Sequence, residues 1–126
     1  MKQQYLYLVY AVNRHSGNTA IKLGFTTNPS KRLATLRQRN KHWEYSDMAV
    51  FKHPTKSYVK IDEQRIHEHF KRERISSSYS FSESPTEHYN SYMDNDIYNT
   101  LLKLGYVWVN QPVQQQVPQS AMFEWY

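Results

Sequence analysis

The stretch QYLYLVYAVNRHSGNTAIKLGFT, residues 4–26, decides the fold of this chain. Both of its ends are rich in β-branched and aromatic residues, and the tripeptide SGN at 16–18 is typical of a turn. The pattern predicts a β-hairpin with strands over residues 4–13 and 19–26. The second strand contains Gly24, one of only three glycines in the chain. A glycine inside a strand either marks a bulge or allows another group to approach the backbone closely.

Helices and strands alternate after the hairpin. An asparagine followed by proline, and then by good helix formers, predicts a short helix over residues 30–40. A third strand is expected over residues 45–53, and the best amphipathic helix of the chain over residues 57–74. The remaining sequence predicts a serine-rich extended loop, a helix and a short strand, in that order: residues 76–92, 94–104 and 106–110.

This order indicates an α+β domain with a small three-stranded, mainly antiparallel sheet flanked by helices. A chain of 126 residues with 39% hydrophobic residues fits one compact domain. We therefore expect a single domain over residues 1–110, which includes the C-terminal helix and short strand, and a polar tail with an aromatic end over residues 111–126. The tail either packs back on the domain, binds a partner or is disordered.

Charge is unevenly distributed along the chain. Residues 1–82 carry 15 Lys and Arg against 6 Asp and Glu, whereas residues 83–126 carry one Lys against five acids. A basic region that also holds many tyrosines favours a polyanionic partner, most simply DNA. Since the chain has no cysteine, any metal must be held by oxygen or imidazole. The apolar runs are too short for a membrane span or a signal peptide, so we expect a cytoplasmic protein without membrane contact.

Glu63 breaks the pattern of the long helix. It lies four residues after Val59 and three before Ile66, so it should project from the apolar face, with His67 directly beside it one turn further on. A carboxylate on a buried face is costly unless it is paired or bound to a metal. Glu63 is therefore either an edge residue paired with Lys or Arg, or a ligand or acid-base group in a cleft.

The first helix and the residues that follow it are basic and contain no acid. Arg32 lies one turn before Leu36, close enough to the apolar stripe to point inward, and an arginine at a helix N-terminus can hold a phosphate. The alternative for Arg32 is plain surface charge. The other cations are a solvated surface or a set of DNA phosphate contacts: Lys31, Arg37, Arg39 and Lys41.

Four short motifs, in this order, resemble the GIY-YIG nuclease superfamily, in its short phage and bacterial branch. LYLVY resembles the first motif and places Tyr7 at its tyrosine. IKLGFT resembles the second, with Lys22 where many members have tyrosine. Arg32 follows Gly24 by eight residues, the spacing of the family's arginine, and EQRIHEHF resembles the helix that carries the metal-binding glutamate, here Glu63.

The resemblance covers residues 4–75 and implies an enzyme, a DNA endonuclease that hydrolyses phosphodiester bonds with one divalent cation, Mg²⁺ or Mn²⁺. It assigns Tyr7 to orienting or deprotonating the attacking water, Arg32 to the scissile phosphate and Glu63 to the cation. Lys22 would either act on the acidity of Tyr7 or contact phosphate.

Further members of the site are open. The histidine that other members carry one turn after the arginine is absent here, so His42 or His67 would take its role, or the role is missing. Asn90 is the candidate for a late asparagine of the family. The implied setting is a bacterial or phage-infected cell, with a homodimer or a protein partner at the tail. The alternatives are a catalytically weak or inactive module that binds DNA or protein, and an RNA-binding module that stacks bases on its tyrosines.

Overall fold

The structure is a computed structural model, which describes residues 2–75 and 87–110. The predicted tail, 111–126, and residues 76–86 of the predicted loop lie outside this part of the chain. Within it, no helix is both long enough and apolar enough to cross a membrane.

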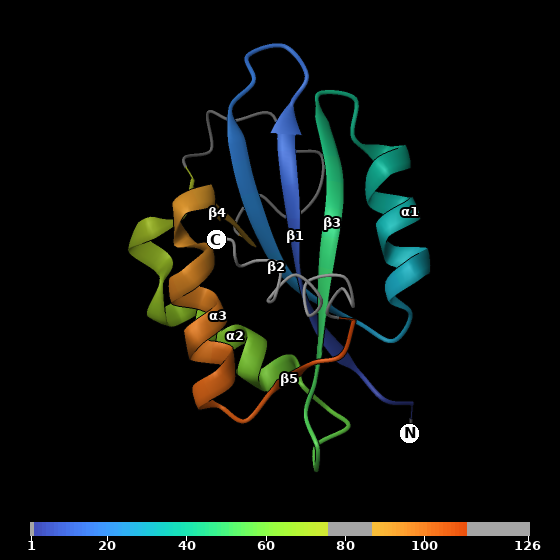
Figure 1. Ribbon diagram of the computed structural model, residues 1–126, viewed down its shortest axis with the longest axis vertical. Helices are drawn as coiled ribbons and strands as arrows, with labels where there is room; N and C mark the ends of the chain where they lie inside the picture. The colour runs from blue at the N-terminus through green and yellow to red at the C-terminus, as the bar shows by residue number, and fades with distance from the viewer. Residues whose placement is uncertain (1, 76–86, 111–126) are drawn as a thin grey trace, which may run out of the picture.

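The described residues form one sheet of five antiparallel strands in the order β4-β2-β1-β3-β5 (Figure 1). The strands are β1 (Tyr5–Asn13), β2 (Thr19–Thr26), β3 (Trp43–Lys52), β4 (His88–Asn90) and β5 (Val107–Trp108). The predicted hairpin, antiparallel pairing and α+β class are confirmed. The predicted number of three strands in the sheet is wrong, because β4 adds to the free edge of β2 and β5 to that of β3. β5 lies within the short strand predicted at 106–110, which was not assigned to the sheet. β4 lies within the predicted loop, 76–92, and is too short to show a strand period in the sequence.

Three helices accompany the sheet: α1 (Pro29–Arg39), α2 (Lys60–His69) and α3 (Asp94–Lys103). α1 begins as predicted, since the Asn28 side chain accepts a hydrogen bond from the Lys31 N–H. α2 is shorter than predicted, because the chain tightens into a 3₁₀ turn at Lys71–Glu73. Figure 1 shows α1 next to β3, and α2 and α3 towards the β2 side of the sheet.

Two apolar clusters lie on opposite faces of the sheet, because successive side chains of β1 alternate between them. Leu6 and Leu8 join the cluster that contains Ile66 of α2. Tyr7 and Val9 join the cluster that contains Leu36 of α1. Side chains from the Tyr7 face can therefore meet side chains of α2 only at an edge of the sheet.

Several hydrogen bonds hold the start of α2 to segments before and after it in the chain. The Gln4 side-chain oxygen accepts from the Val59 N–H at 2.9 Å. Buried Asp62 accepts from the Tyr106 hydroxyl at 2.7 Å and from Lys56 Nζ at 3.0 Å. Burial opposes the charge of Asp62, but these two bonds outweigh it, so its pKa lies below the usual value. The first turn of α2, which includes Glu63, is thus held in place.

Candidate functional site

Glu63 projects from the apolar face of α2 as predicted, and it is 4% exposed. Its Oε2 atom has no hydrogen-bond partner among the described residues. The nearest side chain that could carry a positive charge is that of His67, whose Nε2 lies 3.3 Å from the Glu63 Oε2 atom. This contact lacks the geometry of a hydrogen bond, so a buried carboxylate oxygen is left unsatisfied, which is costly and rare.

His67 is held by two other groups. Its Nδ1 lies 2.6 Å from the Tyr89 hydroxyl, and its Nε2 lies 3.1 Å from the Leu23 carbonyl oxygen. A carbonyl can only accept, so Nε2 carries the proton and the Tyr89 hydroxyl donates to Nδ1. Burial raises the pKa of Tyr89, which keeps that hydroxyl protonated. His67 therefore ties α2 to the edge of β2 beside Glu63.

Lys22 is a buried lysine, 1% exposed, on the Tyr7 face of β2. Its Nζ donates to the Tyr7 hydroxyl oxygen at 2.8 Å and to Glu87 Oε1 at 2.7 Å. Burial lowers the pKa of Lys22, but the Tyr7 oxygen and the Glu87 carboxylate together raise it above the usual value. The ammonium thus keeps its charge inside the protein.

Glu87 lies close both to the pair of Glu63 and His67 and to the pair of Lys22 and Tyr7. It directly precedes β4, whose first residue pairs with Lys22 of β2. Glu87 therefore lies at the edge of the sheet, where β4 begins. Glu63, His67 and Glu87 each place one ligand atom within 4.8 Å of the others. We call these three residues the acidic cluster. It borders a pocket of about 300 Å³.

The donor set of the acidic cluster fits a divalent cation. Carboxylate oxygens are the ligands that Mg²⁺ and Mn²⁺ prefer, and the unsatisfied Glu63 oxygen supplies one of them. Glu87, whose side chain is 26% exposed, supplies another. The proton on His67 Nε2 makes the imidazole a positioning group in this arrangement rather than a ligand.

Gly24 has no side chain, and the side chains of Tyr7 and Lys22 meet in the space where one would lie. A Cβ atom at this position would lie 2.5 Å from the Tyr7 hydroxyl oxygen and 2.9 Å from Lys22 Nζ. β2 keeps a regular register with β1 through Gly24, so the alternative of a bulge is wrong. The glycine lets the Tyr7 phenol lie across β2 and reach the lysine.

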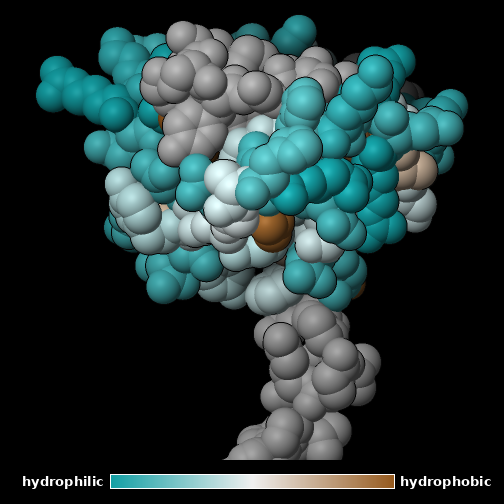
Figure 2. Space-filling view, turned by 90° about the horizontal axis from the view of Figure 1, so that it is seen from above, coloured by the Kyte–Doolittle hydropathy of each residue, from teal (hydrophilic) through white to brown (hydrophobic). Residues whose placement is uncertain are grey.

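The basic residues of α1 divide into two groups. Arg32 is half-buried in the first turn, on the side of α1 that carries Leu36, which packs against the cluster of Tyr7. The other basic residues of α1 are exposed, as is the lysine that follows the helix: Lys31, Arg37, Arg39 and Lys41. Seen from the hairpin end of the sheet, the described surface is mostly hydrophilic (Figure 2). The helix therefore offers accessible cations and places Arg32 on the Tyr7 side of the sheet.

Comparison with protein families matches the T5orf172 domain over residues 4–103. The chain belongs to the T5orf172 domain family. Comparison with curated proteins and with solved structures gives no significant match. The T5orf172 domain is a nuclease-like, DNA-binding type of domain, which is consistent with a DNA-binding module.

The family match corrects the resemblance to the GIY-YIG nucleases, because the two families cannot both describe this domain. That resemblance rested on four short motifs within residues 4–75. The T5orf172 match continues through β4 and to the end of α3, which those motifs did not reach. Short strand and helix motifs share their apolar spacing with many unrelated domains, so they do not by themselves separate families.

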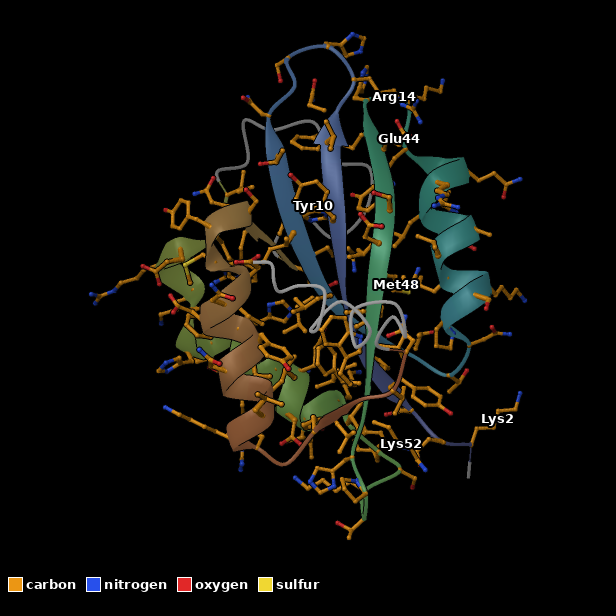
Figure 3. The ribbon with its side chains drawn as sticks, in the orientation of Figure 1. Lys2, Tyr10, Arg14, Glu44, Met48 and Lys52 are labelled. Atoms are coloured by element: carbon orange, nitrogen blue, oxygen red, sulfur yellow. The ribbon has the colours of Figure 1, made fainter. Side chains whose placement is uncertain are left out.

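Two auxiliary residues lie outside the acidic cluster of this T5orf172 domain. His42 contacts His15 at 3.1 Å, at the hairpin end where Figure 3 shows Arg14 and Glu44. Six residues of β1 separate that end from Tyr7, roughly 20 Å along the strand. Asn90, at the other end of β4 from Glu87, bonds the Tyr92 hydroxyl. Of the three auxiliary candidates, only His67 reaches Glu63.

Glu87 was not predicted as a site residue, because it lies within the serine-rich stretch, 76–92, and belongs to no periodic pattern. The available signal was indirect. Lys22 sits in a strand whose neighbours are apolar, and a lysine at a buried position calls for a carboxylate partner. Nothing local identifies that partner, since it lies 65 residues away.

A larger pocket, of about 810 Å³, lies on the α3 side of the sheet. Its lining includes Tyr10 and Met48, which Figure 3 labels, and Tyr98. The two acids that line it, Asp47 and Asp94, are exposed. Among the described residues, this mainly apolar pocket contains no pair of buried ionisable groups, so the smaller pocket beside the acidic cluster is the better candidate.

Proposed function

We propose that this T5orf172 domain is a divalent-metal-dependent DNA endonuclease that hydrolyses phosphodiester bonds beside the acidic cluster. The observation that carries the proposal is the buried Glu63 oxygen, which has no hydrogen-bond partner among the described residues and lies within 4.8 Å of a second carboxylate. A buried carboxylate oxygen without a hydrogen bond, close to a second carboxylate, is stabilised by a cation that joins the two.

Glu63 and Glu87 would hold Mg²⁺ or Mn²⁺. The bound ion would neutralise charge on the phosphoryl oxygens and on the leaving oxygen. The protein contributes rigid placement of Glu63, through the fixed start of α2, and of His67, through its bonds to Tyr89 and Leu23.

Tyr7, Lys22 and Arg32 would act on the phosphate and on the attacking water. The Tyr7 oxygen accepts a bond from the Lys22 ammonium, so its direction is fixed and positive charge lies beside it. Tyr7 has no exposed surface in this conformation. Its oxygen would therefore meet the attacking water only when the pair of Lys22 and Glu87 separates. Arg32 would bind the scissile phosphate from α1.

DNA is the substrate that the charge of the domain favours. The exposed cations of α1 and of the residue pair that follows it would contact phosphates of the duplex: Lys31, Arg37, Arg39 and Lys41. Such phosphate contacts would position the DNA rather than react with it.

The test is plasmid nicking by the wild type and by Glu63→Gln with Mn²⁺ or Mg²⁺. We expect the substitution to lower the cleavage rate by about a hundredfold or more, while DNA affinity in a binding assay changes little. Glu68→Gln is the matched control, since Glu68 is exposed on the same helix and paired with Lys71 at 2.8 Å. DNA binding by the wild type without cleavage of any duplex, nicked or single-stranded substrate would leave the domain as a binding module.

A further inference from the structure

The position of Glu87 between a lysine and a cation site suggests that it serves both. Its Oε1 accepts from Lys22 Nζ at 2.7 Å, and one of its oxygens lies within 4.8 Å of the ligand atoms of Glu63 and His67. An ion held by Glu63 and Glu87 would leave this one carboxylate between two cations, the Lys22 ammonium and the ion, and would draw its negative charge away from Lys22.

The residue that moves is Glu87 rather than Glu63. The Glu63 side chain is 5% exposed and stands on a helix whose start is held by Asp62, whereas the Glu87 side chain is 26% exposed. Rotation of the Glu87 side chain towards Glu63 would place its carboxylate on the ion that Glu63 binds and would lengthen its 2.7 Å bond to Lys22.

A buried ammonium that loses its carboxylate needs another anion, because an unpaired buried charge is strongly unfavourable. Lys22 lies beside the Tyr7 oxygen, so an anion that replaced Glu87 there would also reach Tyr7. A phosphate group of DNA has the required charge and acceptor oxygens. In the cation-free state, Glu87 thus occupies the anion position on Lys22.

We infer that Glu87 is exchanged between Lys22 and the divalent cation, so that cation binding frees the Lys22 ammonium, beside Tyr7, for a phosphate group of the DNA. This inference rests on the proposed function for the role of the phosphate. The exchange itself concerns only this chain and the ion. It makes Lys22 and the cation competitors for one carboxylate, and it couples cation binding to phosphate binding.

The experiment measures Mn²⁺ binding without DNA, by calorimetry or electron paramagnetic resonance, on the wild type and three variants. Glu87→Gln keeps an acceptor for Lys22 but removes the ligand charge, and should weaken Mn²⁺ binding by about tenfold or more. Lys22→Met removes the competitor and should strengthen Mn²⁺ binding by about fivefold. Glu68→Gln, which removes a nearby exposed carboxylate, should change it little.

If Lys22→Met folds poorly, a second measurement on the wild type tests the exchange without that variant. Titration of the folded wild type with Mg²⁺ should shift the ¹⁵Nζ resonance of Lys22, and the same titration of Glu87→Gln should leave it in place. The exchange would be overturned, even if the wild type cleaves DNA, by either of two results. One is an unchanged Mn²⁺ affinity in Glu87→Gln, and the other is a Lys22 ¹⁵Nζ resonance of the wild type that does not shift at saturating Mg²⁺. An exchange seen in both measurements without any cleavage would overturn the endonuclease proposal alone. A wild type that binds no divalent cation would overturn both.

Discussion

Substitution of Gly24 by alanine tests the geometry that joins Tyr7 to Lys22. The added Cβ would lie 2.5 Å from the Tyr7 hydroxyl oxygen, 2.6 Å from its Cζ and 2.9 Å from Lys22 Nζ, whereas ordinary contact begins at 3.4 Å. The phenol and the ammonium would each have to move away from the added Cβ by several tenths of an ångström. Both are buried, so neither can move into solvent.

The expected cost follows from two opposing effects. Overpacking of a filled interior costs about 1–3 kcal/mol. Alanine is favoured over glycine in a strand by about 0.5–1 kcal/mol, because the unfolded chain loses freedom. We therefore expect Gly24→Ala to lower the free energy of unfolding by about 1–2 kcal/mol, which corresponds to a fall in Tm of about 4–8 °C for a domain of this size.

Thermal unfolding followed by circular dichroism or calorimetry measures this change. A double-mutant cycle with Tyr7→Phe, which removes the nearest atom, should recover part of the loss, with a coupling energy of about 0.5 kcal/mol or more. The recovery is partial because Cζ remains at 2.6 Å. A Gly24→Ala variant as stable as the wild type, or more stable, would refute the close crossing of Tyr7 over β2.

Two further predictions concern the start of α2 and the basic surface. The pKa of Asp62 is lowered in the folded state, so its contribution to stability is present above about pH 4 and is lost as the pH falls through the folded pKa. Asp62→Asn should therefore lower the free energy of urea unfolding by about 1–3 kcal/mol near neutral pH and by less near pH 2; an equal loss at both pH values would contradict this. Replacing Arg39 and Lys41 by alanine should reduce the slope of log affinity for DNA against log salt by about 2, in fluorescence anisotropy titrations. An unchanged slope would show that these two side chains do not contact phosphates.

Turn residues, helix caps and helical spacing correctly predicted those parts of the fold that depend on residues close together in the sequence. The turn at 16–18 closes the hairpin, and Asn28 caps α1 with its side chain, as the residue types there indicate. Helical spacing alone placed Glu63 on the buried face of α2 and His67 beside it.

Long-range pairing could not be predicted in the same way. β4 spans only three residues, and its assignment to the edge of β2 depends on the course of the chain after α2. The pair of Lys22 and Glu87 joins residues 65 positions apart. The purpose of Gly24 was likewise open, because the sequence does not show that Tyr7 lies across that strand. These features arise from the packing of distant segments, for which local propensity carries no information.

The most direct test of the central claim is an anomalous difference map from crystals of the protein grown with Mn²⁺. We expect one strong peak between the carboxylates of Glu63 and Glu87, with metal-oxygen distances of about 2.1–2.2 Å, and a Lys22 side chain that no longer touches Glu87. Mn²⁺ bound elsewhere, or an acidic cluster without a peak at concentrations that support cleavage, would contradict it.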